Sequence, residues 1–246
     1  MFRLHECRNY STLLAITAGL ISLPTAFISA PAYAGLRNGS FETGDFTGWS
    51  TTGNTSIKTA SFGSQPKQGN FQALVSTTAD GRTATPGELE DFLGLEPFSL
   101  DNINGPIFSG SALQQEFSAV AGQTLSFNWN FLTNEASQSP NFNGFAFVKI
   151  NKSTQKLADT FSTLIPSSTF FVSETGYRTF SYTIPTTGNY SLGIGVATVG
   201  DAFGGFGILV DNAALVPEPG SVVGLVAIAS ASLGNTLRRR KKKHYK

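Results

Sequence analysis

The chain has almost no cysteine or histidine, and this scarcity removes several kinds of chemistry. Its one cysteine is Cys7, and its two histidines, His5 and His244, lie near the ends of the 246 residues. The long middle part therefore contains no residue for a disulfide, for a zinc site of Cys or His ligands, for a Cys-His nucleophile or for a Ser-His-Asp triad. The chemistry that remains open there depends on carboxylates and on neutral polar groups.

Positive charge is also scarce between the ends. Residues 35–215 contain eight Lys or Arg and 14 Asp or Glu, a net charge of −6, whereas the whole chain has a net charge of +1. A basic patch that binds nucleic acid or an anionic surface is therefore not expected in this part. The excess of cations lies in residues 238–243, which are three arginines followed by three lysines.

The N-terminal apolar run has the features of an export signal. Arg3 and Arg8 precede the apolar residues 13–23, and Ala32-Tyr33-Ala34 comes directly before Gly35. This order is typical of a secretory signal peptide, and the small residues predict cleavage after Ala34. We therefore expect a signal peptide over residues 1–34, with a retained N-terminal anchor as the alternative.

The C-terminal end has a second such order. Val216-Pro217-Glu218-Pro219 is followed by the apolar residues 222–237 and then by the six cations. Proline cannot continue a strand ladder or a helix interior, so the folded domain is expected to span residues 35–215. An apolar helix over 222–237 would be about 24 Å long against a hydrocarbon core of roughly 30 Å, which predicts a short membrane helix with its cations on the cytoplasmic side. A weak anchor or an amphipathic tail is the alternative.

Together these C-terminal features resemble the sorting signal of PEP-CTERM exported proteins of Gram-negative and cyanobacterial type. The resemblance rests on the motif Val216, Pro217, Glu218 and Pro219, the short apolar stretch and the basic end, and it covers residues 216–246. It implies that a membrane-embedded exosortase-type protease cuts near the motif. The protein would then reach the cell envelope or the exterior, transiently anchored through residues 222–237.

The middle part is patterned for strands. Short runs of alternating apolar and polar residues recur between Gly, Pro and Asn, which predicts an all-β fold, an antiparallel β-sandwich with a jelly roll as the favoured topology. The predicted strands are residues 36–42, 71–77, 112–119, 123–132, 144–151, 169–173, 178–184, 190–198 and 207–215. The clearest is 125–131, whose alternation points Trp129 into the core. Residues 87–95 predict one short helix, whose acidic residues form a solvated face.

The two ends of the predicted sandwich offer a candidate metal site. Residues 38–42 resemble the opening strand of jelly-roll carbohydrate-binding modules, and residues 208–215 resemble their final strand. In those modules the positions of Glu42 and Asp211 supply carboxylates to a structural calcium, and hard oxygen ligands are what calcium requires. The alternative is that both carboxylates hydrogen-bond to loop backbone and bind no metal.

The candidate ligand-binding residues are aromatic. Trp49 and Tyr177, and also Tyr182 and Tyr190, are the candidates for stacking on sugars, and Trp49 follows a glycine in a predicted loop. The stretches 111–127, 133–147, 179–182 and 193–196 are similar to a recurrent secreted domain of cyanobacterial-type sorted proteins, and no activity follows from that similarity.

These features predict an exported, surface-directed protein that is not an enzyme and associates with extracellular polysaccharide, as an adhesive, structural or sugar-binding module. The alternative is a glycoside hydrolase or polysaccharide lyase. That chemistry needs only two carboxylates, and Glu116, Glu135 and Glu174 are the strand-adjacent candidates.

Overall fold

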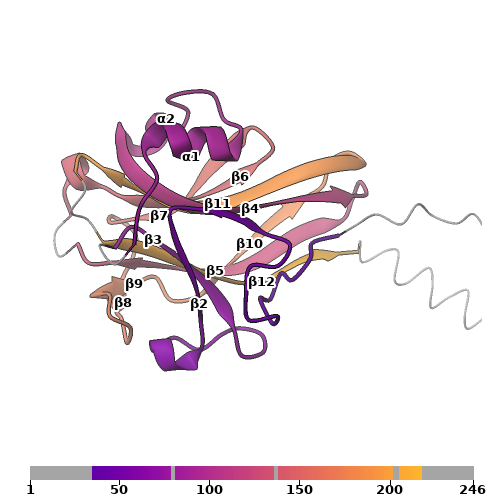
Figure 1. Cartoon of the computed structure of the whole chain (residues 1–246), viewed down its shortest axis with the longest axis horizontal. Helices are drawn as coiled ribbons and strands as arrows, with labels where there is room; N and C mark the ends of the chain where they lie inside the picture. The colour runs from indigo at the N-terminus through magenta and orange to yellow at the C-terminus, as the bar shows by residue number, and fades with distance from the viewer. Residues whose placement is uncertain (1–34, 79–80, 136–137, 202–204, 218–246) are drawn as a thin grey trace, which may run out of the picture. The chain divides into compact units, whose positions relative to one another are not determined.

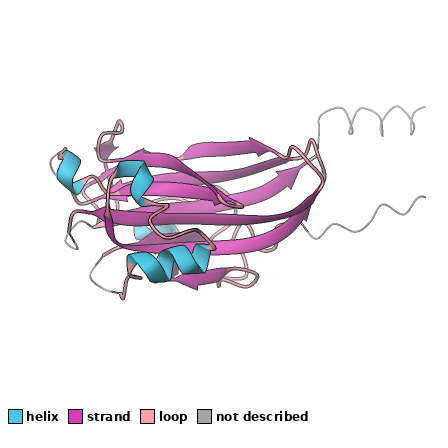
Figure 2. Ribbon diagram, turned by 90° about the horizontal axis from the view of Figure 1, so that it is seen from above, coloured by secondary structure: helices cyan, strands magenta, loops and turns pink. Residues whose placement is uncertain are grey.

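The computed structural model describes residues 35–78, 81–135, 138–201 and 205–217, and these residues form two antiparallel sheets that pack face to face (Figures 1 and 2). Within the described ranges, sheet A has five strands in the order β1-β4-β11-β6-β7. Sheet B has seven, in the order β2-β3-β12-β5-β9-β8, with β10 also paired to β5. The predicted β-sandwich is confirmed.

The elements have the following bounds. The strands of sheet A are β1 (Ser50–Thr52), β4 (Ile107–Ala119), β6 (Phe145–Ile150), β7 (Ser153–Asp159) and β11 (Gly188–Val199). Those of sheet B are β2 (Asn54–Lys58), β3 (Gln72–Ser76), β5 (Thr124–Thr133), β8 (Ile165–Pro166), β9 (Ser173–Glu174), β10 (Arg178–Thr183) and β12 (Phe206–Val216). The helices are α1 (Pro86–Leu93) and α2 (Asp101–Asn104), with short 3-10 turns at η1 (Ala60–Phe62) and η2 (Pro140–Phe142).

The main core lies between the two sheets. The alternation in β5 places Phe127, Trp129 and Phe131 on the inner face, and all three are buried. They pack with apolar residues of both sheets, including Leu113 of β4 and Ile208 of β12. The prediction that Trp129 belongs to the core is confirmed, and each such aromatic contributes about 1.5–3 kcal/mol through burial.

A second apolar cluster lies on the outer face of sheet A, where α1 packs across the strands (Figure 1). Leu89 and Leu93 of α1 are fully buried there, together with Phe145 and Phe147. The helix begins with a capping box between Thr85 and Glu88, and it ends at Gly94 in the left-handed region. The predicted helix over 87–95 is therefore confirmed, and its apolar side covers part of a sheet face. The prediction that its acidic residues form a solvated face is wrong for Glu90, which is buried and accepts the backbone N–H groups of Phe98 and Leu100.

Two predicted strands are wrong. Residues 36–42 form tight turns, because Asn38 and Phe41 adopt positive φ, and the bond from Ala213 N to Gly39 O at 2.8 Å joins them to β12. Residues 169–173 form a loop up to β9, in which the hydroxyls of Ser167 and Thr169 accept bonds from nearby backbone N–H groups. Such local bonds compete with a strand ladder.

Several strands were not predicted: β1, β2, β7 and β8. β7 is mostly polar and exposed along its first half, so it lacks an apolar alternation, and its pairing with β6 keeps it in the sheet. The predicted signal peptide 1–34 and the predicted membrane helix 222–237 lie outside the described residues and stay predictions. Among the residues that the structure describes, we find no helix with the length and apolar character needed to span a membrane.

Two glycines of α1 and its cap provide a test of the backbone. A methyl group at Gly87 or at Gly94 would meet no atom within 4 Å, but Gly87 is helical whereas Gly94 has φ of 63°. We expect Gly87→Ala to raise the free energy of unfolding by about 0.5–1 kcal/mol. Gly94→Ala should lower it by about 1–2 kcal/mol, because an L side chain is strained in the left-handed region. Denaturant unfolding of both variants measures this, and equal effects of the two substitutions would contradict it.

Candidate functional site

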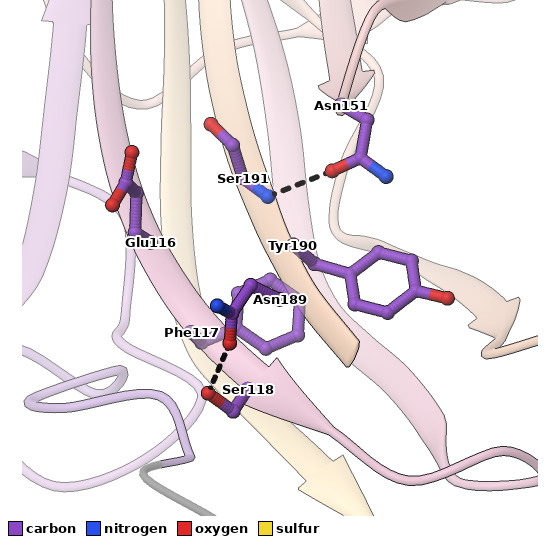
Figure 3. A pocket seen from close by; sticks show the side chains of 7 residues that line it. All are labelled: Glu116, Phe117, Ser118, Asn151, Asn189, Tyr190 and Ser191. Atoms are coloured by element: carbon purple, nitrogen blue, oxygen red, sulfur yellow. Dashed lines mark hydrogen bonds between the residues drawn. The ribbon is translucent and has the colours of Figure 1, made fainter. Parts of the chain in front are cut away.

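The part of the outer face of sheet A that α1 leaves uncovered is a polar groove. It consists of two hollows of about 420 Å³ and 350 Å³ that share Glu116 of β4. The first is lined by Glu116, Phe117, Ser118, Asn151, Asn189, Tyr190 and Ser191 (Figure 3). The second is lined by Arg37, Gly48, Ser50, Gln114, Gln115 and Glu116. We call these two hollows the sheet A groove.

The groove is built by side chains that alternate outward on neighbouring strands. Glu116 and Ser118 of β4 lie opposite Ser191 and Asn189 of β11 in the strand register. Figure 3 shows the Ser118 hydroxyl donating to Asn189 Oδ1 at 2.6 Å, and the Ser191 N–H donating to Asn151 Oδ1 at 3.0 Å. Hydroxyl and amide groups held in this way can exchange hydrogen bonds with a polar ligand in either direction.

The prediction that Trp49 is a stacking platform is wrong. Its side chain is buried, with 7% of the residue exposed, and its ring packs on Phe41 with centroids 5.5 Å apart. The indole N–H donates to the Asn38 carbonyl at 3.1 Å. The turns of residues 38–49 place the indole in the core, where its large apolar area is buried. Its sequence neighbours Gly48 and Ser50 line the groove, and Trp49 itself does not.

Tyr177 lies on the other sheet. It is half-buried against the outer face of sheet B, and its hydroxyl donates to Gln72 Oε1. The Lys67 ammonium lies 5.2 Å from the ring centroid and occupies one face of the ring. Burial raises the pKa of the Tyr177 hydroxyl, and the negative charges of Asp211 and Glu174 add to the rise. The structure therefore does not bring Trp49 and Tyr177 together in one site.

Glu42 and Asp211 do converge, on one loop. Asp211 Oδ2 accepts the backbone N–H groups of Lys67 at 2.6 Å and Gln68 at 2.8 Å. Glu42 Oε1 accepts those of Asn70 and Phe71, both at 2.9 Å. Asp211 is fully buried, and burial raises its pKa; bonds from backbone N–H groups oppose the rise, and the nearby charge of Glu42 adds to it. We call this arrangement the carboxylate clamp on residues 67–71.

The clamp meets part of what a calcium ion requires. Two carboxylates bind the same loop, the charge of Glu42 acts on Asp211, and the ion pairs found within the described residues involve neither of them. Each oxygen has lone pairs beyond those used by the N–H groups. However, the described residues contain no group of three or more His, Cys, Asp and Glu side chains that could hold a metal. Glu42 and Asp211 could therefore supply two ligands, and backbone carbonyls or water would have to supply the others.

The three acids considered for carboxylate catalysis do not form one site. Glu116 lies on the outer face of sheet A, whereas Glu174 is on β9 of sheet B and accepts a bond from the Ser167 hydroxyl at 2.8 Å. Glu135 follows β5 in sheet B, where burial and the charge of Asp201 raise its pKa. Glu116 thus has neither of the other two candidates beside it on its sheet face.

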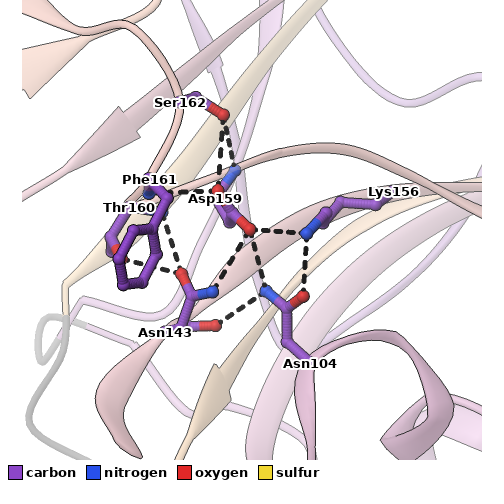
Figure 4. Close-up of polar contacts among 7 residues, drawn as sticks. All are labelled: Asn104, Asn143, Lys156, Asp159, Thr160, Phe161 and Ser162. Atoms are coloured by element: carbon purple, nitrogen blue, oxygen red, sulfur yellow. Dashed lines mark hydrogen bonds and ion pairs between the residues drawn. The ribbon is translucent and has the colours of Figure 1, made fainter. Parts of the chain in front are cut away.

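A polar cluster that the sequence did not reveal centres on Asp159 at the end of β7 (Figure 4). Its carboxylate pairs with the Lys156 ammonium at 2.6 Å and accepts bonds from Asn143 and Asn104. Burial alone would raise the pKa of Asp159, but these donors outweigh it and hold the pKa below its ordinary value. Since the partners come from three separate segments, no local pattern announces the cluster. Its groups bond to one another, so it acts as a structural tie.

Comparisons with known proteins show likeness at the level of architecture. No family model matches the chain, and no match was found among curated proteins. Among solved structures it is similar to TmCBM61 in complex with β-1,4-galactotriose, with 14% identity over 75% of this chain and 99% of that one, at a TM-score of 0.43. It is also similar to Caldicellulosiruptor saccharolyticus CBM27-1 in complex with mannohexaose, with 13% identity over 77% and 99%, at a TM-score of 0.44. An adhesin domain of Lys-gingipain from Porphyromonas gingivalis matches with 12% identity over 73% and 96%, at a TM-score of 0.36. With TM-scores below 0.5, the case for a function depends on the residues of this chain.

Proposed function

We propose that the protein is an exported, non-catalytic surface protein that binds extracellular polysaccharide through the sheet A groove, with the sandwich taken as a jelly roll. The observation that carries the proposal is the lining of this groove. Small hydroxyl and amide side chains surround one carboxylate, and the two hollows adjoin along the strands. Sugar hydroxyls both donate and accept hydrogen bonds, and such a lining can do the same.

The groove also favours binding over hydrolysis. Cleavage of a glycosidic bond by acid and base requires two carboxyl groups separated by roughly 5 to 10 Å across the substrate. Glu116 is the only carboxylate that lines either hollow of the groove as the structure describes it. The hydrolase or lyase alternative lacks its second group at this position.

The groove has no exposed aromatic platform among the residues that the structure places along it. Phe117 and Tyr190 border the first hollow, but both side chains are buried and pack on each other with centroids 5.8 Å apart. Affinity must therefore come from hydrogen bonds, which contribute about 0.5–1.5 kcal/mol each. Binding of a short sugar should be weak, and attachment to a long polymer would gain from several domains bound along it.

Matched polar pairs on the two sheets test the groove. Ser118→Ala and Asn189→Ala should each weaken retardation in gels containing polysaccharide about five-fold, the effect of losing about 1 kcal/mol. The control is Thr179→Ala on sheet B, where Asn128 donates to the Thr179 hydroxyl at 2.9 Å on an equally exposed surface. Neutral and acidic polysaccharides are both assayed, and release of reducing ends is followed in parallel. Absence of retardation, or equal loss in the control, would exclude the groove, and release of reducing ends would revive the hydrolase.

The proposal places the protein outside the cell, tethered for a time by its C-terminal segment. This is supported by the end of β12 at Val216, which is 49% exposed, and by the exposed Pro217 that follows it, because both lie on the surface at the start of the proposed sorting motif. Glu218, Pro219 and the predicted membrane helix lie outside the described residues.

Processing can be read from the C-terminus of the protein recovered from cells. Mass spectrometry should find an end near Pro219, because a substrate next to an exposed strand end needs no unfolding of the domain to be cut. Replacement of Pro217-Glu218-Pro219 by three alanines should leave the full-length chain with Lys246. Recovery of Lys246 in the native mature protein would reject the processing step and leave the sugar-binding test unaffected.

We further propose that the carboxylate clamp holds a calcium ion that stabilises residues 67–71. Calcium at about 100 times its dissociation constant would add about 2.7 kcal/mol, which for a domain of this size raises the melting temperature by about 5–10 °C. Glu42→Gln and Asp211→Asn should each abolish this rise.

Behaviour without calcium separates the two variants. The amide in Glu42→Gln keeps an oxygen that can accept both loop N–H groups, so stability should change little. The amide in Asp211→Asn has only one acceptor oxygen and cannot receive all three backbone bonds that reach the two oxygens of Asp211, so this variant should lose about 1–3 kcal/mol. Titration of calcium into chelator-treated protein, with no heat and no thermal shift, would show that the clamp is only a hydrogen-bonded tie.

A further inference from the structure

Lys149 is a buried lysine with neutral partners. Only 3% of its surface is exposed, and its ammonium donates to Gln114 Oε1 at 2.9 Å and to the Ser191 hydroxyl at 2.8 Å. Two other lysines on the side of sheet A, Lys152 and Lys156, pair with carboxylates. A charge without a bonded counter-charge is costly to bury, so the position of Lys149 calls for an explanation.

The strand register explains how the side chain reaches its partner. Lys149 of β6 and Gln114 of β4 both lie opposite Gly193, on the strand β11 that separates them. Because Gly193 has no side chain, the Lys149 chain can cross over β11. A methyl group at Gly193 would come within 3.2 Å of Lys149 Cδ and 2.7 Å of Leu93 Cδ2. The Lys149 side chain therefore reaches from β6 to β4 over Gly193, and Leu93 of α1 packs above the glycine.

The Gln114 carboxamide, which Lys149 contacts, is fixed in its orientation. Gln114 Oε1 accepts from Lys149, and Gln114 Nε2 donates to the Phe92 carbonyl at 3.2 Å, so both ends of the amide are fixed. Burial lowers the pKa of the Lys149 ammonium, although the charge of Glu116 raises it in part. The lowered pKa increases the fraction of Lys149 that is a neutral amine, and the neutral amine is the form that can act as a nucleophile. Glu116 lies two residues along the same face of β4, and its charge acts on the Lys149 ammonium.

We propose that Lys149 and Gln114 form an intramolecular isopeptide bond that joins β6 to β4 across β11. The neutral Lys149 Nζ attacks Gln114 Cδ, and a bond forms between these two atoms. The bond from Cδ to Nε2 breaks, and one proton moves from Nζ to Nε2, with Glu116 as the carrier. Ammonia leaves and a secondary amide remains, so the step needs no oxidant, reductant or other co-reactant.

Such a bond would serve a domain that cannot form disulfides. Residues 35–215 contain no cysteine. The link would tie three adjacent strands of sheet A under α1 and next to the sheet A groove. It would also remove the buried positive charge, because a secondary amide is neutral. The proposal does not depend on sugar binding, on calcium or on processing.

Peptide mapping of the denatured full-length chain tests the proposal. Trypsin cuts after free lysine but not after acylated lysine, so the expected product is a peptide of residues 83–152, uncut at Lys149 and lighter by one ammonia. Fragment ions must place the loss between Gln114 and Lys149. The variant Lys152→Arg keeps a cleavage site and should give the same linked peptide, whereas Gln114→Ala should give residues 83–149 with no loss of ammonia.

The variant Glu116→Gln separates the proton carrier from the bond itself. It retains both linked residues, and the linked peptide should accumulate more slowly after synthesis of the chain than in the wild type. A wild-type digest with residues 83–149 at full mass would overturn the proposal, whatever the folding of the variants. Ammonia loss located at another amide, or an unchanged rate in Glu116→Gln, would overturn the bond or the role of Glu116, respectively.

Discussion

The arrangement of sheet A depends on the small outer face of its central strand. β11 presents Gly193 and Gly195 on this face, and Gly110 of β4 lies beside them. A methyl group at Gly193 would meet Leu93, one at Gly110 would meet Leu89, and one at Gly195 would meet Phe147, all within 2.7 Å. These positions must therefore lack side chains for α1 and Phe147 to pack on this face of the sheet. The absence of a side chain at Gly193 also lets Lys149 cross over β11, next to the sheet A groove.

Sheet B is organised by a different interaction. Carboxylates accept backbone N–H groups from residues 67–71, so a loop without regular structure has its donors satisfied by Glu42 and Asp211, which are far from it in sequence. A bond to a charged acceptor is stronger than a bond between neutral groups, and it offsets part of the cost of burying Asp211. The loop then stays in place where β12 and the turns of residues 38–44 meet. Whether or not a cation joins them, the two carboxylates determine the geometry of this end of the sandwich.

Elements that depend on interactions between residues close in sequence were predicted correctly, and those that depend on distant residues were not. β5 was predicted because its inner face alternates with period two, and α1 because its cap and apolar spacing are local. Trp49 was misplaced because a glycine beside an aromatic residue predicts an exposed loop, while the burial of the indole depends on turns with positive φ at Asn38 and Phe41. The tie around Asp159 could not be predicted, since its donors come from α2, from the start of β6 and from β7 itself. The convergence of Glu42 and Asp211 was anticipated from a resemblance between strand ends, although residues 36–42 form turns.

The absence of cysteine gives these features a common consequence. Residues 35–215 contain no cysteine and so form no disulfide, and links between distant segments beyond the apolar core are therefore polar or covalent by another route. Three of the polar links among the described residues involve charged side chains that are buried: the clamp at Asp211, the tie at Asp159 and the bridge from Lys149 to Gln114. The clamp and the tie place a carboxylate among several donors, which is stable without further reaction. The bridge instead places an amine next to a carboxamide, a pair that can react only when the amine has lost its proton, and burial of Lys149 favours that loss. Of the three links, it is therefore the one whose chemistry can proceed beyond a hydrogen bond.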